Sequence, residues 1–352
     1  MINHIGYLFF FCFFLITLNF LLKKNNLLIY KTFKLNHKKK YNNVYLSGGL
    51  YFFISSLIIF FYFGFNNNFF QNFIFLIVFI SILILGILAD VNIFTNARNR
   101  LLTLTLILII LKFENIFFIE KIDLKFITEN KFFLDVFSIF CILILINGFN
   151  FIDGTDGNVS LLFSHILIIL MLLSYKNVNV VLDQNIKIFI IASLVFFIFN
   201  ILKINFNGDS GAYCLGFFIS IFAINFYNNN YHNVSSFFIV NLLFYPAYEV
   251  LFCIIRRLSI NDNPLKAGSL HIHHLLNNFI YNLSNKFNIA FLKHKYGLLT
   301  TIILNFIFFS TSYFALSMEM DHIYQLKILI LNIFLYNSLY LILFISSKKG
   351  KV

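Results

Sequence analysis

Eleven long apolar runs divide the chain, and they constrain its fold more than any other feature of the sequence. Each run is close to the ~20 residues that a helix needs to cross the hydrocarbon core of a bilayer. The runs cover residues 5–22, 46–65, 69–89, 101–118, 132–151, 158–175, 186–204, 211–227, 235–255, 297–317 and 325–346. We therefore expect an all-α, polytopic integral membrane protein with a single membrane-embedded domain over residues 1–352.

The composition excludes a water-soluble domain. Of the 352 residues, 60% are hydrophobic and only 11% are charged, whereas soluble domains carry about 25% charged residues. The four cysteines lie singly in apolar runs and without Cys-x-x-Cys spacing, which favours core packing over a disulfide framework or a zinc site. The first apolar run lacks a charged segment before it and a small-residue cleavage site after it, so we expect a span and not a removable signal peptide.

The distribution of lysine and arginine predicts the orientation of the chain. With the amino terminus outside and the carboxyl terminus in the cytoplasm, 19 of the 26 Lys and Arg residues lie in cytoplasmic loops or the cytoplasmic tail. The net charge of +12 then reflects membrane topology, and its natural neighbours are anionic lipid headgroups and anionic substrates. We do not expect a nucleic-acid partner.

The polar break at residues 147–157 is the most unusual segment. It places two carboxylates, two amides and three glycines between two apolar runs. Charged side chains at a membrane boundary indicate a functional site by default. Asp153 and Asp156 are three residues apart, so they face the same side if the segment forms a helical turn. The alternative is a polar turn in which an aspartate caps the next helix.

Five short motifs lie in the polar segments that this topology places in the cytoplasm. They are Ser47-Gly48-Gly49-Leu50, Ala89-Asp90 followed by Arg98 and Arg100, Asn150-x-x-Asp153-Gly154-x-Asp156-Gly157, Gly208-Asp209-Ser210-Gly211, and His271-Ile272-His273-His274. In this order and on this topology, the series resembles the polyprenyl-phosphate N-acetylhexosamine-1-phosphate transferases, the MraY- and WecA-like membrane proteins of the glycosyltransferase family 4 type. The resemblance covers a motif-bearing core of about residues 36–276 and leaves the last two apolar runs outside it.

The resemblance implies an enzyme that moves N-acetylhexosamine-1-phosphate from a UDP-sugar to undecaprenyl phosphate and releases UMP. Such a reaction starts a lipid-linked surface glycan, for example the O antigen of lipopolysaccharide or a capsule, at the cytoplasmic face of a bacterial plasma membrane. Both reactants are polyanions, so catalysis needs a divalent cation and positioned hydrogen-bond donors. The implied cofactor is Mg²⁺ or Mn²⁺, and the implied oligomer is a homodimer.

The acidic residues receive their roles from the resemblance. Asp209 matches the metal ligand of the family, and a helix N-cap is its alternative role. Asp90, Asp153 and Asp156 match the catalytic acids. Ala89 stands where the family has the first acid of a pair. A lipid phosphate with a second pKa of about 6 still supplies a nucleophilic dianion near neutral pH without a strong base.

A second group of matched residues is expected to bind the substrates. It comprises Lys38, Arg98, Asn150, His271, His273 and His274. For the histidines, a zinc site and a solvated cluster are the alternatives, and for Lys38 the alternative is a general membrane-facing basic run. Pro246 should kink its helix. Glu249 has two open roles, because it can pair with one of the arginines at 256 and 257 or face the site.

Two other functions are alternatives to the transferase hypothesis. A transporter or flippase of lipid-linked sugars also needs many spans and buried charge, but transporters usually have repeated halves and polar residues at mid-bilayer. In this chain the acids lie at the predicted inner ends of the spans, and no internal repeat is evident. A catalytically degenerate homologue that only binds lipid-linked sugar is the third reading, and Ala89 is the reason to consider it.

Overall fold

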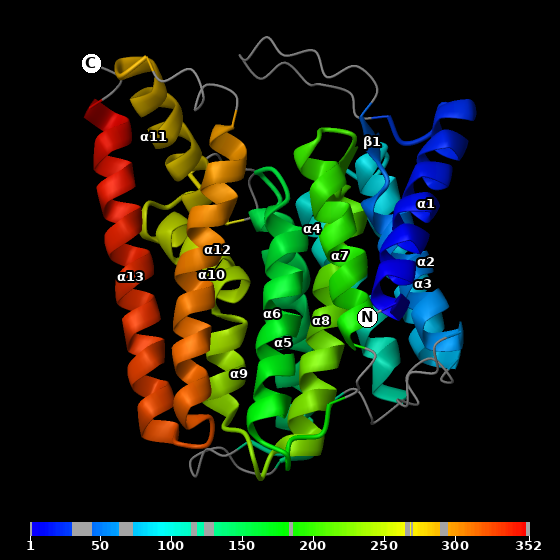
Figure 1. Ribbon diagram of the computed structural model, residues 1–352. Helices are drawn as coiled ribbons and strands as arrows, with labels where there is room; N and C mark the ends of the chain where they lie inside the picture. Colours follow the sequence, from blue (N-terminus) through cyan, green and yellow to red (C-terminus); the bar gives the residue numbers. More distant parts are fainter. Residues whose placement is uncertain are drawn as a thin grey trace.

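The computed structural model describes residues 2–29, 44–62, 73–113, 118–122, 130–182, 186–264, 268, 270–288 and 295–349. These residues are almost entirely helical (Figure 1). The elements are α1 (Ile2–Lys24), β1 (Tyr45–Leu46), α2 (Gly48–Tyr62), α3 (Phe73–Asp90), α4 (Ala97–Ile110), η1 (Leu111–Phe113), α5 (Lys131–Ile152), α6 (Asn158–Lys176), α7 (Ile186–Ile201), β2 (Asn205–Phe206), α8 (Gly208–Asn230), α9 (Ser236–Leu242), α10 (Phe244–Ser259), α11 (Ile272–Lys286), α12 (Tyr296–Ala315), η4 (Leu316–Met318) and α13 (His322–Lys349).

Within the described residues, each of the eleven apolar runs lies mostly on a helix or on the pair α9 and α10. Within the described ranges, seven helices are long and apolar enough to cross a membrane, and the bent pair makes eight. The apolar helices α2 and α7 are shorter, and α4 has only 14 residues. The structure therefore confirms a polytopic helical membrane protein, while the count of eleven spans and the orientation of the termini stay predictions.

The run at 235–255 forms two helices and not one kinked helix. The axes of α9 and α10 differ by 78°, and the break lies at Leu243. Pro246 is the third residue of α10, where its missing N–H removes no hydrogen bond because the first N–H groups of a helix have no partner inside it. Proline thus fits the new start of the helix, and the bend precedes it.

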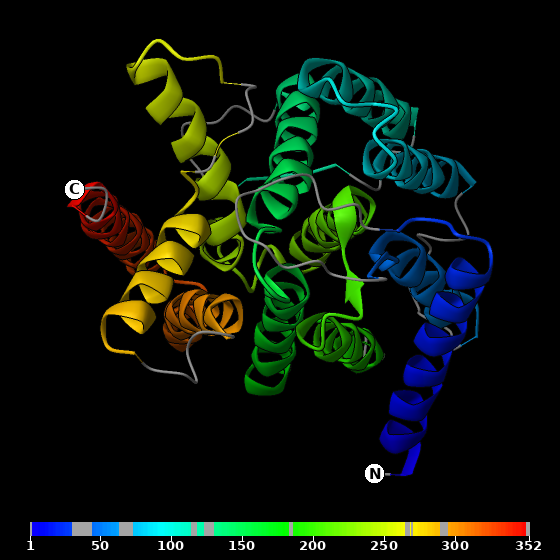
Figure 2. The same ribbon diagram turned by 90° about the horizontal axis from the view of Figure 1, so that it is seen from above.

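Helix α8 lies in the middle of the bundle and packs against α2, α3 and α5 (Figure 2). Of the residues in its 18-residue apolar segment, 94% are buried inside the protein. Glycines allow this convergence. A Cβ atom on Gly48 would lie 2.6 Å from the Cα of Asn207, and one on Gly49 would lie 2.5 Å from the Cβ of Ser210. Gly86 of α3 approaches the backbone of Ser210 as closely. The glycines of the first motif therefore let α2 reach the start of α8.

A short parallel pairing ties separate segments together at the same end. β1 and β2 pair with Tyr45 opposite Asn205 and Leu46 opposite Phe206. The side-chain amide of Asn205 donates to the hydroxyl of Ser47, and Asn19 of α1 donates to Asn205 over 2.8 Å. These bonds hold the ends of α1 and α7 and the starts of α2 and α8 close together.

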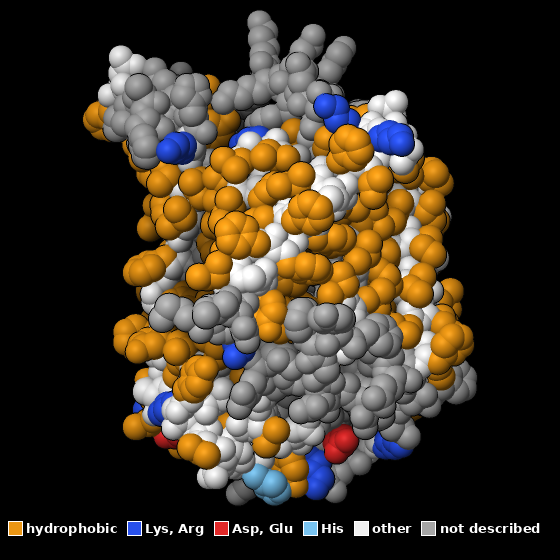
Figure 3. Space-filling model, turned by 45° about the vertical axis from the view of Figure 1, so that its right-hand side comes forward, with side chains coloured by type: hydrophobic (Ala, Val, Ile, Leu, Met, Phe, Trp, Pro, Cys, Tyr) orange, Lys and Arg blue, Asp and Glu red, His pale blue; other side chains and the backbone are white. Residues whose placement is uncertain are grey.

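The surface between the two ends of the bundle is apolar. Phe9, Phe73, Phe306 and Phe334 are between 68% and 74% exposed. On the face in Figure 3, hydrophobic side chains make up most of the coloured surface between the two ends, and most Lys and Arg side chains lie toward the upper and lower margins. Exposed apolar surface of this extent contacts lipid. All four cysteines are free, as the sequence indicated.

Candidate functional site

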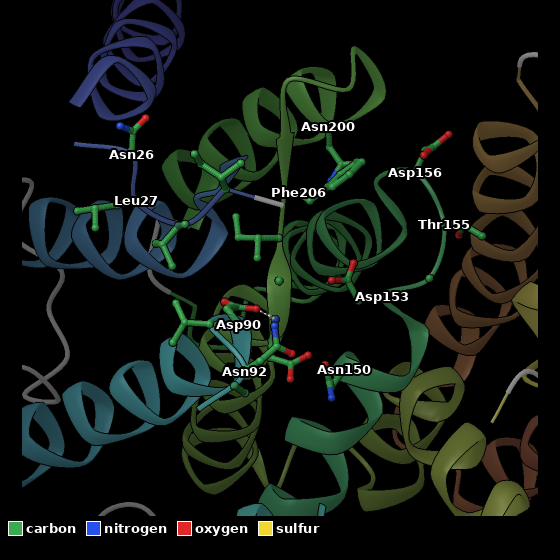
Figure 4. Close-up of a pocket in the computed structure, with 18 of the residues that line it drawn as sticks. Asn26, Leu27, Asp90, Asn92, Asn150, Asp153, Thr155, Asp156, Asn200 and Phe206 are labelled. Carbon is green, nitrogen blue, oxygen red and sulfur yellow. Dashed lines mark hydrogen bonds between the residues drawn. The ribbon is translucent and has the colours of Figure 1, made fainter. Parts of the chain in front are cut away.

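A cavity of about 850 Å³ lies at the end of the bundle where α3 and α5 end and α8 begins (Figure 4). Its lining includes the matched acids of three separate motifs, Asp90, Asp153 and Asp209, together with Asn150. The rest of the described lining is Asn26, Leu27, Leu28, Ile29, Leu46, Ala89, Val91, Asn92, Gly154, Thr155, Asp156, Asn200, Phe206, Gly208 and His274. The fold thus brings the acidic motifs together in one hollow.

Asp90 caps the start of α8. One of its carboxylate oxygens accepts the backbone N–H of Asp209 over 2.7 Å, and the other accepts the N–H and the hydroxyl of Ser210 over 3.2 and 2.6 Å. Asn207, the N-cap residue of α8, makes no capping bond with its own side chain. Gly208 has a φ of +69°, and a Cβ atom there would lie 2.6 Å from the Asp90 carboxylate. Asp90 therefore supplies both the acceptors and the negative charge that a helix N-terminus favours.

Asp209 forms an ion pair with Arg100 at 2.5 Å, and the two side chains are 30% and 22% exposed. Arg98 was the arginine expected to bind substrate, but it is exposed and lines neither of the two polar cavities described here. Arg100 is the arginine that reaches the carboxylates, because it lies two residues further into α4.

Asp153 directly follows the last residue of α5. The side-chain amide of Asn207 donates to its carboxylate over 3.2 Å. Burial, together with the negative charges of Asp209 and Asp90, raises the pKa of Asp153 to about 7, and the Asn207 bond opposes that rise. This carboxyl group therefore lies in a site where added negative charge is unfavourable and a cation is favourable.

Asp156 does not face the same way as Asp153. Because α5 ends at Ile152, residues 153–157 form a turn and not a helical turn, and the two side chains point apart in Figure 4. Asp156 forms an ion pair with Lys203, which follows α7. It lines the same cavity at a different place. The expectation of a same-side acidic pair therefore does not hold.

A second cavity of about 450 Å³ adjoins the first. Both linings include Asn150, Asp153, Gly154 and His274, which form the wall between them. The second cavity adds basic and polar groups, namely Arg100, Asn147, Tyr213, Arg257, His271 and His273. The two cavities together place carboxylates and cationic or donor groups on opposite sides of a shared wall.

The histidine motif begins α11 and lines the second cavity. His271 Nδ1 lies 2.9 Å from a carboxylate oxygen of Glu249, whose other oxygen accepts the Tyr336 hydroxyl over 2.7 Å. Glu249 thus faces the histidines and pairs with neither of the arginines at 256 and 257. Burial lowers the pKa of His274 to about 4 and that of His273 well below its usual value, and neighbouring histidines add to both shifts.

His273 is fully buried against Gly154, and neither of its ring nitrogens has a hydrogen-bond partner within the described residues. A buried unpaired imidazole is costly and often marks a place where a ligand completes the bonding. The sequence assigned substrate binding to all three histidines. The structure brings them to one wall of the site, and their roles remain proposals.

The carboxylates fit a Mg²⁺ ion. No trio of His, Cys, Asp or Glu side chains within the described ranges is arranged as a complete metal cage. Mg²⁺ does not require one, because it keeps several waters and usually takes one or two carboxylates plus substrate phosphate oxygens. Asp153 and Asp209 line one cavity, and burial together with the charges of Asp209 and Asp90 raises the pKa of Asp153. Lys38 lies outside the described residues.

Several site residues had no assigned role in the sequence analysis. Lys203 pairs with Asp156, Asn207 donates to Asp153, and Tyr336 donates to Glu249. Asn207 directly precedes the Gly208-Asp209 motif, so its position was a usable signal. Nothing in the sequence distinguishes Tyr336 from other aromatic residues of the last apolar run.

Comparison with known proteins supports the family that the motifs indicated. Residues 72–227 match the family model described as glycosyl transferase family 4. An undecaprenyl-phosphate alpha-N-acetylglucosaminyl 1-phosphate transferase of Thermotoga maritima is 28% identical over 145 residues, which cover 40% of this chain and 42% of the relative. A probable undecaprenyl-phosphate N-acetylglucosaminyl 1-phosphate transferase of Bacillus subtilis is 32% identical over 173 residues, which cover 46% of this chain and 42% of the relative.

The matched part of the chain thus spans less than half the length of each of these two relatives. The family match includes Asp90, the motif from Asn150 to Gly157, and Asp209, and it ends before the histidine motif. With its motifs gathered at one end of a bundle of membrane-length helices, the chain is similar to glycosyl transferase family 4 over residues 72–227.

Proposed function

We propose that the chain transfers N-acetylhexosamine-1-phosphate from a UDP-sugar to undecaprenyl phosphate and so starts a lipid-linked surface glycan. The active face is the end of the bundle that holds the two polar cavities, on the cytoplasmic side of a bacterial plasma membrane. One observation carries the proposal: Asp90, Asp153 and Asp209 come from motifs far apart in the sequence and meet in one cavity beside a wall of histidines.

The reaction joins two anions. An oxygen of the lipid phosphate attacks the β-phosphorus of the UDP-sugar, and the bond from that phosphorus to the oxygen bridging it to the α-phosphorus breaks. The products are a lipid-linked sugar pyrophosphate and UMP. Repulsion between the phosphates is the main obstacle, so stabilising charge is the main contribution that a protein can make.

A bound Mg²⁺ or Mn²⁺, held by Asp209 and Asp153, would neutralise charge on the pyrophosphate. The chain's own groups then provide orientation. Asp90 fixes the first turn of α8, and that turn carries Asp209. Arg100 balances the charge of Asp209 and lies within reach of the second cavity. Asn150 and His274 line both cavities, and His271 and His273 line the second. From these positions they can donate to phosphate or sugar oxygens.

The position of the site supports a lipid acceptor. The cavities lie where helix ends meet polar segments, and the flanks of the bundle expose large apolar side chains. A substrate with a polyprenyl tail in the bilayer and a phosphate at the headgroup level would reach such a site from the membrane.

The test is direct turnover. Detergent-purified protein is mixed with undecaprenyl phosphate, Mg²⁺ and a panel of UDP-N-acetylhexosamines, and UMP release is measured. We expect UMP from at least one donor, dependent on both the lipid phosphate and the divalent cation. An active relative serves as the positive control. If no donor yields UMP while the control is active, the proposal is wrong, and the transport or binding readings replace it.

A further inference from the structure

Three polar side chains from distant parts of the chain form a buried series beside the second cavity. They are Tyr336 of α13, Glu249 of α10, and His271, which directly precedes α11. The Tyr336 hydroxyl lies 2.7 Å from one Glu249 oxygen, and His271 Nδ1 lies 2.9 Å from the other. Glu249 is only 1% exposed and Tyr336 is fully buried, so water does not compete for these bonds.

The chemistry of this series fixes the proton on His271. An ionised carboxylate only accepts hydrogen bonds, so both Tyr336 and His271 must donate to Glu249. The proton of His271 is therefore on Nδ1, and the ring orientation is set, since its edge also packs against Phe151 with ring centroids 5.1 Å apart. Nε2 makes no hydrogen bond with any described residue, and His271 lines the second cavity.

Burying an ionised glutamate is unfavourable unless its carboxylate is paired with a positive group or hydrogen-bonded. Here the carboxylate faces a histidine that borders a site for anions. When Nε2 carries a proton and donates to a phosphate oxygen, Glu249 stabilises the resulting positive ring. The other titratable or charged groups that line the second cavity with His271 are Arg100, Asp153, Tyr213, Arg257, His273 and His274. Among the described residues, the carboxylate that hydrogen-bonds to His271 is that of Glu249.

We propose that Glu249 and Tyr336 are positioning residues that hold His271 ready to bind a phosphate oxygen of the nucleotide sugar. The inference rests on the proposed function and extends the site to the last helix, α13, beyond the segment that matches the family. Neither residue touches substrate directly. Both act through His271, so their removal should have no additional effect once the histidine is gone.

The experiment compares four single variants, Glu249→Gln, Tyr336→Phe, Tyr340→Phe and His271→Ala, and one double variant by KM for the nucleotide sugar and by kcat. Glu249→Gln should raise KM about tenfold, because one charge-assisted hydrogen bond is weakened. Tyr336→Phe removes only a hydroxyl and should raise KM by roughly threefold. Tyr340→Phe is the matched control, since Tyr340 lies one turn further along α13 and its buried hydroxyl makes no hydrogen bond within the described chain. It should keep the wild-type KM.

The double variant Glu249→Gln with His271→Ala decides between positioning and general structure. If Glu249 acts through His271, the double variant has the KM of His271→Ala alone. Effects that multiply would overturn the inference. So would a wild-type KM in Glu249→Gln. If Glu249→Gln does not fold, Tyr336→Phe against Tyr340→Phe decides, because equal KM values in those two variants also refute the role.

A second readout does not depend on turnover. In protein labelled with ¹⁵N-histidine, the His271 signal is identified by its loss in His271→Ala. We expect a proton on Nδ1 in the wild type and a shifted signal in Glu249→Gln and Tyr336→Phe. An unchanged His271 signal in both variants refutes the inference. A wild type that shows this signal but releases no UMP refutes the proposed function alone.

Discussion

Replacing Asp90 with asparagine separates a role in folding from a role in proton transfer. The carboxylate accepts three hydrogen bonds from the first turn of α8, two of them on the oxygen that faces Ser210. An asparagine presents one oxygen and one NH₂ group, so at least one of these donors loses its acceptor. Hydrogen bonds to charged groups are each worth roughly 1.5–3 kcal/mol, and Asp90→Asn should lower the free energy of unfolding by about 2 kcal/mol.

The same structure predicts how activity changes. Asp209 is the first acid of α8, so a loosened first turn displaces it, and small displacements of a catalytic group cost rate. We expect UMP release to fall about tenfold in Asp90→Asn. Ser210→Ala removes only the 2.6 Å hydroxyl bond and should cost about 1 kcal/mol, with a smaller loss of rate.

The assay measures initial rates of UMP release and thermal unfolding midpoints in the same detergent for both variants. Loss of rate should follow loss of stability in the order Ser210→Ala, then Asp90→Asn. A base that transfers protons predicts a different outcome, a loss of about 10²–10⁴ in rate confined to Asp90. An Asp90→Asn protein with the wild-type midpoint and a rate reduced more than about a hundredfold would refute the capping argument.

Three further predictions follow from the site. Asp209→Asn should keep the wild-type free energy of unfolding within about 1 kcal/mol, because partly exposed ion pairs contribute little. Its turnover should fall by about 10²–10³. Wild-type turnover with unchanged Mg²⁺ dependence would contradict the role of Asp209 as metal ligand. Asp153→Asn, studied in EDTA, should lose less stability than wild type as the pH rises from 5 to 8. Because burial raises the Asp153 pKa to about 7, ionisation between these values removes stability only from the wild type, and parallel pH profiles would exclude this. Cysteines placed near His273 should resist an impermeant reagent applied from outside, whereas a cysteine replacing the exposed Asn229 at the opposite end should react; the reverse pattern would overturn the predicted topology.

The fold was largely predictable because its main determinant is local. Helical structure in a membrane follows from the length of an apolar run, since a bilayer leaves no other way to satisfy the backbone. The break at Leu243 was not predictable, because Asn241, Pro246 and Glu249 all interrupt the hydrophobicity of the run at 235–255 and none of them marks Leu243 as the place where the helix breaks. The short α4 shows the same limit, since an apolar run does not determine where its helix ends.

The residues of the site could be predicted from the sequence, but the contacts between them could not. The acidic motifs were located from their charge and spacing, and the structure brings Asp90, Asp153 and Asp209 into one cavity. Their pairings depend on tertiary packing. The capping of α8 by Asp90 requires α3 to end beside it, and the Asp156–Lys203 pair requires the turn after α5. For the same reason, the link from Tyr336 to the histidines has no signature in the sequence.

The burial of α8 also decides which parts of the site are able to move. Because 94% of the residues in its apolar segment are buried, α8 is confined by a close-packed interior. It cannot tilt or slide without displacing its neighbours. Asp209 is then a fixed point. The histidines sit on α11, beyond the 78° break between α9 and α10, and outside the group of helices that encloses α8. Any opening or closing around bound phosphates would therefore be a motion of α11 and its histidines relative to a stationary Asp209.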